Sequence, residues 1–247
     1  MRLALITDLH ANREAVSAVM AHAQAQGADR YAFLGDYVGY GAEPGWVVDL
    51  VREHVERGAI AVMGNHDEAV VAGPRQTMIA DAREVADWTR AHLSGEQLAF
   101  LAARPISAVI DDILCVHANA YAPAEWGYVE GRTEAVRSLH ACTQRYTFCG
   151  HVHEPRLFHL TAAGKAGDFD PAPGMAIPLS SQRRWLAIAG SVGQPRDGNP
   201  AASYAIFEPD TATLTFHRVA YDNESAAAKV RAAGLPEALA QRLIDGA

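Results

Sequence analysis

The stretch that decides the fold is RLALITDLHANREAVSAVMAHAQAQ, residues 2–26. Its first part, Arg2–Asp8, is a short and nearly continuous apolar run, which is typical of a strand buried on both faces. Its second part, Arg13–Gln26, places apolar residues such as Val16 and Met20 at helical spacing. A strand followed directly by an amphipathic helix predicts the start of an α/β fold.

The same alternation continues through the next forty residues. The apolar runs Tyr31–Asp36 and Ala59–Asn65 predict strands, and the amphipathic stretch Gly45–Arg57 between them predicts a helix. Strands that alternate with helices in this way form a partly parallel sheet that helices cover. We therefore expect an α/β protein.

The remaining chain is less regular, but its segments can still be assigned. Residues 68–104 are helical in pattern, with helices expected at Met78–Ala91 and Ser94–Ala103. The later expectations are a hairpin of Ile106–Ile110 with Ile113–His117, a helix at Glu130–Ala141, strands at Arg145–Phe148 and Trp185–Ala189, a long loop at Ala162–Pro178, a hairpin of Ala202–Glu208 with Ala212–Val219, and a broken helix at Glu224–Asp245. We expect one domain over residues 1–247, with a helical insert at about 68–105.

Net charge, cysteine spacing and the lengths of the apolar runs argue against several classes of protein. The formal net charge of −8 argues against general nucleic-acid binding, which requires a basic patch or stripe. Three cysteines without CxxC spacing do not indicate a disulfide framework. The segment MRLALITDLH has too short an apolar run for a secretory signal, and no run is long enough to span a membrane. We expect a cytoplasmic protein.

Polar side chains of a few kinds follow one predicted strand after another. They are Asp8 and His10 after LALIT, Asp36 after YAFLG, Asn65 and His66 after AIAVMG, His117 after ILCV, and His151 and His153 after YTFCG. Five of the 11 histidines fall at these positions. Because ligands bind outside the carboxyl ends of strands in α/β sheets, we expect these residues to gather in one place.

The chemistry of this set predicts a metal centre. Carboxylates, imidazoles and one amide suit Mn²⁺, Zn²⁺, Fe or Ni²⁺, whereas structural zinc sites favour closely spaced cysteines. The set exceeds the needs of one ion and fits two divalent metal ions that share a bridging carboxylate. Such a pair activates water and binds both oxygens of a displacement at phosphorus.

Each residue also has an ordinary structural interpretation when it is taken alone. Asp8 could cap a helix, Asp36 could belong to a turn, and His117 could be a buried core histidine. No single structural need accounts for the whole set, and the metal-centre hypothesis does.

The motifs, taken in order, resemble a known family. They are Asp8-Leu9-His10, Gly35-Asp36, Gly64-Asn65-His66-Asp67, His117 and Gly150-His151-Val152-His153. This pattern is similar to that of the calcineurin-like metallophosphoesterases, and the resemblance runs from residue 5 to about 153. The stretch AGSVGQPRDGNPAASYAIF, residues 189–207, resembles a loop and strand of the compact bacterial phosphodiesterase members.

The resemblance implies a four-layer α/β/β/α sandwich and specific roles for the polar residues. It implies one metal held by Asp8, His10 and His153, a second held by Asn65, His117 and His151, and Asp36 as the bridge. It further implies attack by a metal-bridging hydroxide, with His66 as the general acid for the leaving group. Manganese is the favoured metal.

One block departs from the phosphoprotein-phosphatase branch of the family. Gly39 and Tyr40 stand where that branch carries an Asp that orients the histidine and an Arg that binds phosphate. This favours a hydrolase of phosphomonoesters or phosphodiesters of small molecules or nucleotides. A serine/threonine phosphoprotein phosphatase and a non-catalytic metal-binding module on the same fold remain alternatives.

Three further residues are weaker candidates. Arg196 and Asn12 are expected to contact substrate, although Arg196 could be a solvated loop arginine and Asn12 the cap of a helix. Asp67 is expected to orient its neighbours. The expected partner is a small phosphorylated substrate and not a membrane, and the sequence leaves open whether the chain forms a homo-oligomer.

Overall fold

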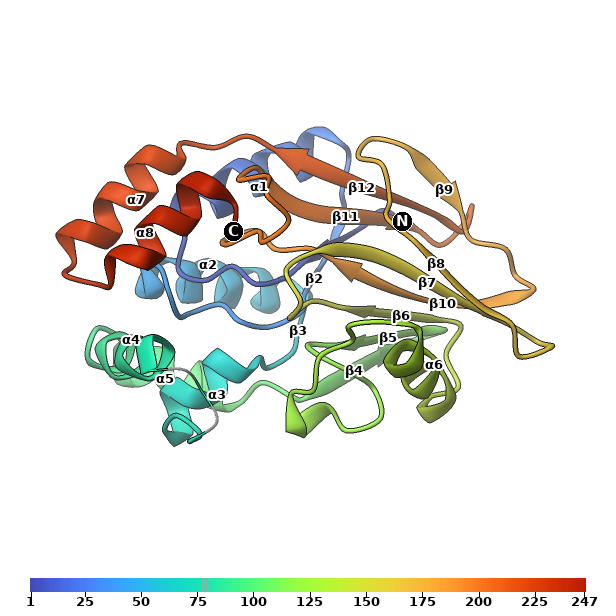
Figure 1. Cartoon of the computed structure of the whole chain (residues 1–247), viewed down its shortest axis with the longest axis horizontal. Coiled ribbons are helices and arrows are strands. Elements are labelled where there is room, and N and C mark those ends of the chain that lie inside the picture. The colour runs from blue at the N-terminus through green and yellow to red at the C-terminus, as the bar shows by residue number, and fades with distance from the viewer. Residues whose placement is uncertain (77, 79) are drawn as a thin grey trace.

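Two six-stranded mixed sheets form the centre of the molecule (Figure 1). The computed structural model describes residues 1–76, 78 and 80–247. The first sheet has the order β3-β2-β1-β11-β12-β9 and the second the order β4-β5-β6-β10-β7-β8. The strands are β1 (Leu3–Ile6), β2 (Arg30–Phe33), β3 (Ile60–Ala61), β4 (Ser107–Ile110), β5 (Ile113–Val116), β6 (Tyr146–Cys149), β7 (Pro155–Thr161), β8 (Ala166–Phe169), β9 (Ala176–Pro178), β10 (Arg183–Ala189), β11 (Ala202–Glu208) and β12 (Thr213–Val219).

The helices begin and end at residues with recognisable caps and breaks. They are α1 (Arg13–Ala25), α2 (Pro44–Glu56), α3 (Asn65–Ala72), α4 (Ala80–Ala91), α5 (Gly95–Ala102), α6 (Arg132–Ala141), α7 (Asn223–Ala232) and α8 (Glu237–Asp245), with a short 3-10 turn at Pro123–Glu125. Ser94 and Gln97 form the predicted capping box at α5. The predicted break between α7 and α8 contains Gly234 at φ 72° and Pro236.

Alternate residues of β1 show how the layers are built. Leu3 and Leu5 lie in the core between the two sheets, together with Phe148 of the second sheet. Ala4 and Ile6 face the other way, into a core that α1 and α2 cover. Helix α6 covers the outer face of the second sheet. The four-layer α/β/β/α arrangement is therefore confirmed, and β1 and β5 are buried along their whole length as their apolar runs predict.

Strand direction brings the ends of several strands to one region. β2 is parallel to β1 and β3 in the first sheet, and β6 is parallel to β5 and β10 in the second. The carboxyl ends of parallel neighbours lie at the same edge of a sheet. The polar residues that follow β1, β2, β3, β5 and β6 therefore lie at the same end of the molecule.

The sequence prediction is wrong for the stretch 162–178. The predicted loop contains β8, which pairs with β7, and β9, which pairs with β12. Neither strand shows the apolar alternation of a core strand, because both lie at sheet edges where backbone pairing is enough. A glycine stands at position 167 of β8 because a Cβ at Gly167 would lie 2.6 Å from Nε2 of His159. The hairpins β4–β5 and β11–β12 are confirmed.

A separate apolar cluster joins segments far apart in the sequence. Ala82 and Val85 of α4 pack with Val230 of α7 and with Leu239 and Leu243 of α8. In Figure 1, α3 to α5 and the C-terminal pair α7–α8 lie at the same end of the molecule. The helical segment predicted at 68–105 is thus fixed against the C-terminal helices.

Replacing Phe207 with alanine should lower the free energy of unfolding by about 3–5 kcal/mol. Phe207 is fully buried between the sheets, with its ring 4.7 Å from that of Tyr146 and 5.1 Å from that of Phe148. The loss combines lost burial with a cavity that the two sheets cannot close. Urea unfolding followed by circular dichroism measures it. Phe169→Ala, at a side chain 39% exposed, is the control and should cost less than about 1 kcal/mol.

Candidate metal centre

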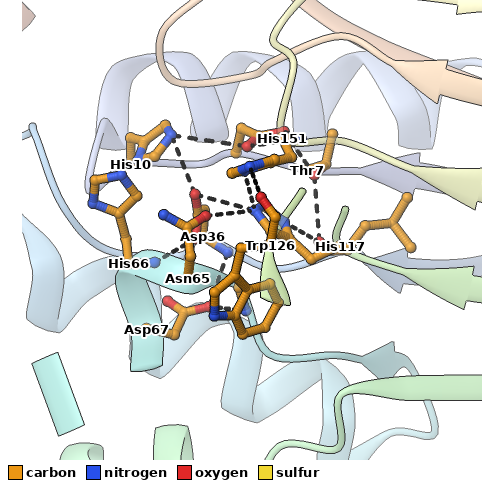
Figure 2. Close-up of polar contacts among 12 residues, drawn as sticks. Thr7, His10, Asp36, Asn65, His66, Asp67, His117, Trp126 and His151 are labelled. Carbon is orange, nitrogen blue, oxygen red and sulfur yellow. Dashed lines mark hydrogen bonds and ion pairs between the residues drawn. The ribbon is translucent and has the colours of Figure 1, made fainter. Parts of the chain in front are cut away.

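The structure brings all the polar residues that follow the strands into one cluster. Asp8, His10, Asp36, His66, His117, His151 and His153 are buried, and Asn65 is partly buried beside them. Figure 2 shows side chains from both sheets pointing toward one another. Because the set spans about 145 positions of sequence, only the meeting of the two sheets places it together.

The first group within the cluster consists of Asp8, His10 and His153. Nε2 of His153 lies 3.3 Å from Oδ1 of Asp8 and 3.1 Å from Nε2 of His10. Nε2 of His10 is 3.9 Å from the same carboxylate oxygen. One carboxylate oxygen and two imidazole nitrogens therefore face a common point.

The second group consists of Asp36, Asn65, His117 and His151. Nε2 of His117 lies 3.0 Å from Oδ1 of Asn65, 3.1 Å from Nδ1 of His151 and 3.3 Å from Oδ2 of Asp36. The same Oδ2 of Asp36 is 3.8 Å from Nε2 of His10 in the first group. One oxygen of Asp36 is thus shared by the two groups.

The four histidines of these groups each direct one ring nitrogen toward the cluster. Each uses its other ring nitrogen to donate to a backbone carbonyl. The pairs are His10 Nδ1 with Val38 O at 3.1 Å, His117 Nδ1 with Leu34 O at 2.8 Å, His151 Nε2 with Trp126 O at 2.9 Å and His153 Nδ1 with Gln194 O at 2.5 Å. A neutral imidazole that donates through one nitrogen is an acceptor at the other. The acceptor nitrogens of His10 and His153 therefore face each other at 3.1 Å, an arrangement that a bound cation stabilises.

The electrostatics agree with a cluster of ligands. Burial and the neighbouring His153 hold the pKa of His10 well below its usual value, and burial and His117 lower the pKa of His151 to about 3. Burial also lowers the pKa of His117, but Asp36, Asp8 and the Leu34 carbonyl outweigh it and raise the pKa to about 9. A divalent cation at Nε2 of His117 would take the place of that proton.

The backbone turns sharply at five of the cluster residues. The φ angles are 53° at Asp8, 46° at His10, 54° at Asp36, and 68° at both His151 and His153. Non-glycine residues in this left-handed region cost about 1–3 kcal/mol each and concentrate at functional sites. Hydrogen bonds from Asp8 N to Gly35 O and from His10 N to Asp36 O hold the turns.

Two glycines of the motifs are required by close approach. A Cβ on Gly150 would lie 2.0 Å from Oγ1 of Thr7 and 2.3 Å from Oδ2 of Asp8. A Cβ on Gly64 would lie 2.2 Å from Oδ1 of Asp36. Gly150 therefore makes room for the Asp8 carboxylate. Asp8 Oδ2 then accepts from the backbone N–H of His151 at 3.0 Å.

Asp67 joins the second and third strand ends. Its carboxylate accepts from the backbone N–H groups of Gly64 at 2.9 Å, Asp36 at 2.8 Å and Tyr37 at 2.9 Å. The side chain is fully buried, and burial together with Asp36 raises its pKa to about 8. Asp67 thus fixes the backbone on which Asp36 and Asn65 stand, as expected for a residue that orients its neighbours.

His66 lies at the edge of the cluster beside an unexpected tyrosine. Its ring is 5.1 Å from that of His10 and 4.5 Å from that of Tyr40. Burial, His153, His117 and Arg196 lower its pKa to about 4, against the opposing effect of Asp36. Gly39 leaves room for this ring, since a Cβ at Gly39 would lie 2.6 Å from Nδ1 of His66.

A cavity of about 600 Å³ opens over the cluster. Its lining includes Tyr40, Asn65, His66, Glu68, Arg75, Met78, Ala82, Glu125, Trp126, Tyr128, His151, Arg196 and Arg242. Arg196, which the sequence suggested as a substrate contact, is in this lining. Its guanidinium donates to Oε1 of Gln194 at 3.0 Å and to the hydroxyl of Tyr40 at 3.5 Å.

Asn12 does not belong to this cavity lining. Its Oδ1 accepts from Ala15 N at 3.1 Å, and its Nδ2 donates to Gly193 O and to the Tyr221 hydroxyl. The helix-cap interpretation therefore accounts for these contacts, and a substrate contact by Asn12 stays a prediction.

Several site residues could not be found from the sequence motifs. The ring of Tyr128 stacks on His151 at 4.1 Å, and Trp126 offers its carbonyl to the same imidazole. Thr7 donates to Asp8 Oδ2 at 2.8 Å. Trp126 and Tyr128 lie in an irregular loop between β5 and α6, where neither spacing nor periodicity signals a role.

The whole chain matches known proteins that share this architecture. The model of the calcineurin-like phosphoesterase superfamily domain matches residues 1–212. Protein MJ0912 of Methanocaldococcus jannaschii, itself uncharacterized, is 32% identical over 251 residues, covering 99% of this chain and 98% of that protein. A crystal structure of a metallophosphoesterase from Sphaerobacter thermophilus has 38% identity and a TM-score of 0.88, covering 100% of this chain and 99% of the other.

Hypothetical protein PH1004 of Pyrococcus horikoshii shares the fold, with a TM-score of 0.77 at 16% identity over 100% of this chain and 98% of its own.

The chain belongs to the calcineurin-like phosphoesterase superfamily. It is a metal-dependent hydrolase of phosphoric esters. Within the described residues, no helix has the length and apolarity needed to cross a bilayer.

Replacing Asp67 with asparagine should destabilise the protein by about 1–3 kcal/mol. The amide NH₂ would face buried backbone N–H groups of Gly64 and Asp36 or of Tyr37, and these donors would lose their acceptor. Chemical denaturation measures the change. Asp87→Asn, at an exposed position of α4, is the matched control and should stay within about 0.5 kcal/mol of the parent. Equal effects of the two substitutions would contradict the anchoring role of Asp67.

Proposed function

We propose that this protein is a dinuclear phosphoesterase that hydrolyses phosphomonoesters or phosphodiesters of small molecules or nucleotides. The observation that carries the proposal is the shared position of Asp36 Oδ2, 3.8 Å from His10 Nε2 and 3.3 Å from His117 Nε2. Asp8, His10 and His153 would hold one divalent cation, and Asn65, His117 and His151 the other, with Asp36 between them. Two cations held this way activate water and bind the ester oxygens.

The ligand atoms are oxygens and imidazole nitrogens, and the described residues of the cluster include no thiol. Such a set suits borderline divalent cations, of which Mn²⁺ is our preferred assignment. The hydrogen bonds from the histidines to the carbonyls of Val38, Leu34, Trp126 and Gln194 fix the rings before any cation arrives. Preorganisation of this kind keeps the ester phosphate in one orientation.

His66 is the general acid of the proposed reaction. It lies beside the cluster, its ring 5.1 Å from that of His10, and it lines the cavity in which the leaving group would sit. Burial lowers the pKa of His66 to about 4 in the chain without cations or substrate. The negative charge of a bound ester stabilises the protonated imidazole and raises that pKa toward the working range.

Arg196 is the second polar group that we assign to the ester phosphate. After β2, Gly39 and Tyr40 stand where the phosphatase branch has an Asp and an Arg. Arg196, in the loop after β10, donates to the Tyr40 hydroxyl. A guanidinium in this place can bind a phosphate oxygen. The presence of Gly39 and Tyr40 in place of the two phosphatase residues supports a small substrate. A phosphopeptide panel assayed beside small diesters tests the alternative of a protein phosphatase.

Asp36→Asn should remove activity toward bis(p-nitrophenyl) phosphate by more than the roughly 100-fold that loss of an outer metal partner costs. The neutral amide offers one oxygen and no charge between two cations, so binding of both weakens. Mass spectrometry of the metal content and assay of chelator-treated protein with Mn²⁺ restored measure the two effects. The parent should hold two ions per chain, and Asp87→Asn should match it. A fully active Asp36→Asn variant would overturn the dinuclear proposal.

His66→Ala should slow hydrolysis of esters with poor, alkyl leaving groups by on the order of 100-fold or more. The p-nitrophenyl ester should suffer much less, because its leaving group departs without a proton. Steady-state rates for a matched alkyl and p-nitrophenyl pair provide the comparison, and the metal content should be close to that of the parent. Equal losses for both esters, or metal loss like that of Asp36→Asn, would contradict the role of general acid.

A further inference from the structure

The cavity over the cluster is larger than an ester phosphate requires. Its volume of about 600 Å³ lies in the range of pockets that enclose a ligand of nucleotide size. The cluster residues Asn65, His66 and His151 line only one part of it. The rest of the lining is therefore available to the part of the substrate beyond the phosphate.

Two helices far apart in the sequence contribute to the rest of the lining. Ala82 lies on α4, and Arg242 lies in the last turn of α8. The family match ends at residue 212, so α8 lies outside it. The apolar cluster of α4, α7 and α8 holds this wall and includes Tyr40, which links the wall to the rim of the metal cluster. The position of Arg242 is thus fixed by packing.

Three arginines line the cavity, and they differ in their partners. Arg75 forms a two-point ion pair with Glu68, with Nε 2.8 Å and Nη2 3.0 Å from the carboxylate oxygens. In the described part of the chain, no ion pair within 4 Å involves Arg196 or Arg242. The two glutamates of the lining, Glu68 and Glu125, both lie within 4 Å of Arg75, so the guanidinium groups of Arg196 and Arg242 remain available to an anionic ligand.

We infer that the substrate is a phosphoester of nucleotide size that carries a second anionic group, and that Arg242 binds this group. The inference rests on the proposed function, in which two cations and Arg196 already offset the charge of the ester phosphate. A further cation on the wall then has no partner unless the substrate brings another anion. Arg242 is accordingly a specificity-determining residue.

Two thymidine esters that differ by one phosphate test this inference. They are thymidine 5′-(p-nitrophenyl phosphate) and the same ester with a 3′-phosphate, assayed with the full chain loaded with Mn²⁺. We expect the 3′-phosphate to raise kcat/KM about 10-fold or more, mainly through KM. Arg242→Gln should remove most of this advantage. Arg231→Gln, whose arginine pairs with Glu237 on the surface, is the matched control and should retain it.

Calorimetry separates a failure of this inference from a failure of the proposed function. Thymidine 3′,5′-bisphosphate should bind the parent about 10-fold more tightly than thymidine 5′-monophosphate, and Arg242→Gln should abolish the difference. That result without turnover of either ester would support the second-anion site and overturn the proposed function. Turnover with no preference for the 3′-phosphate, or an equal loss for both esters in Arg242→Gln, would overturn the inference.

Discussion

The convergence of two imidazole nitrogens on Oδ2 of Asp36 is the constraint on which the rest of the site depends. His10 and His117 approach this oxygen from either side, and the outer nitrogen of each is committed to a backbone carbonyl. Charges this close interact strongly in a medium of low dielectric constant, and the Asp36 carboxylate raises the pKa of His117 to about 9. A divalent cation in the same place would take over the role of that proton.

This arrangement strains the backbone at several cluster residues. Asp8, Asp36 and His151 take left-handed φ angles directly after buried strands, and glycines 64 and 150 leave room for the carboxylates. Packing between the sheets, which buries Leu5 and Phe148, keeps the strands in place despite that strain. The metal centre and the cavity wall come from different elements, because the polar cluster follows the strands whereas Ala82 lies on α4 and Arg242 on α8.

Periodicity predicted the strands and helices with strong apolar patterns and failed where pairing needs no side chain. β1 and α1 follow from the run at 2–8 and the helical spacing at 13–26, and both are confirmed. β8 and β9 were missed because edge strands can be polar or rich in glycine. Asn12 was ambiguous because an amide suits a helix cap as well as a substrate, and the structure shows it in contact with Ala15 and Gly193 as the cap of α1.

The sequence by itself determined the α/β class and the residue types of the metal centre, because a strand that ends in Asp, His or Asn places that side chain at the sheet edge. Tertiary structure alone decided which of them share a carboxylate oxygen, and it brought Tyr40, Tyr128 and Arg242 to the same cavity. The physical reason is that these last contacts join separate elements and depend on the packing between them. Local propensity and spacing carry no information about such distances.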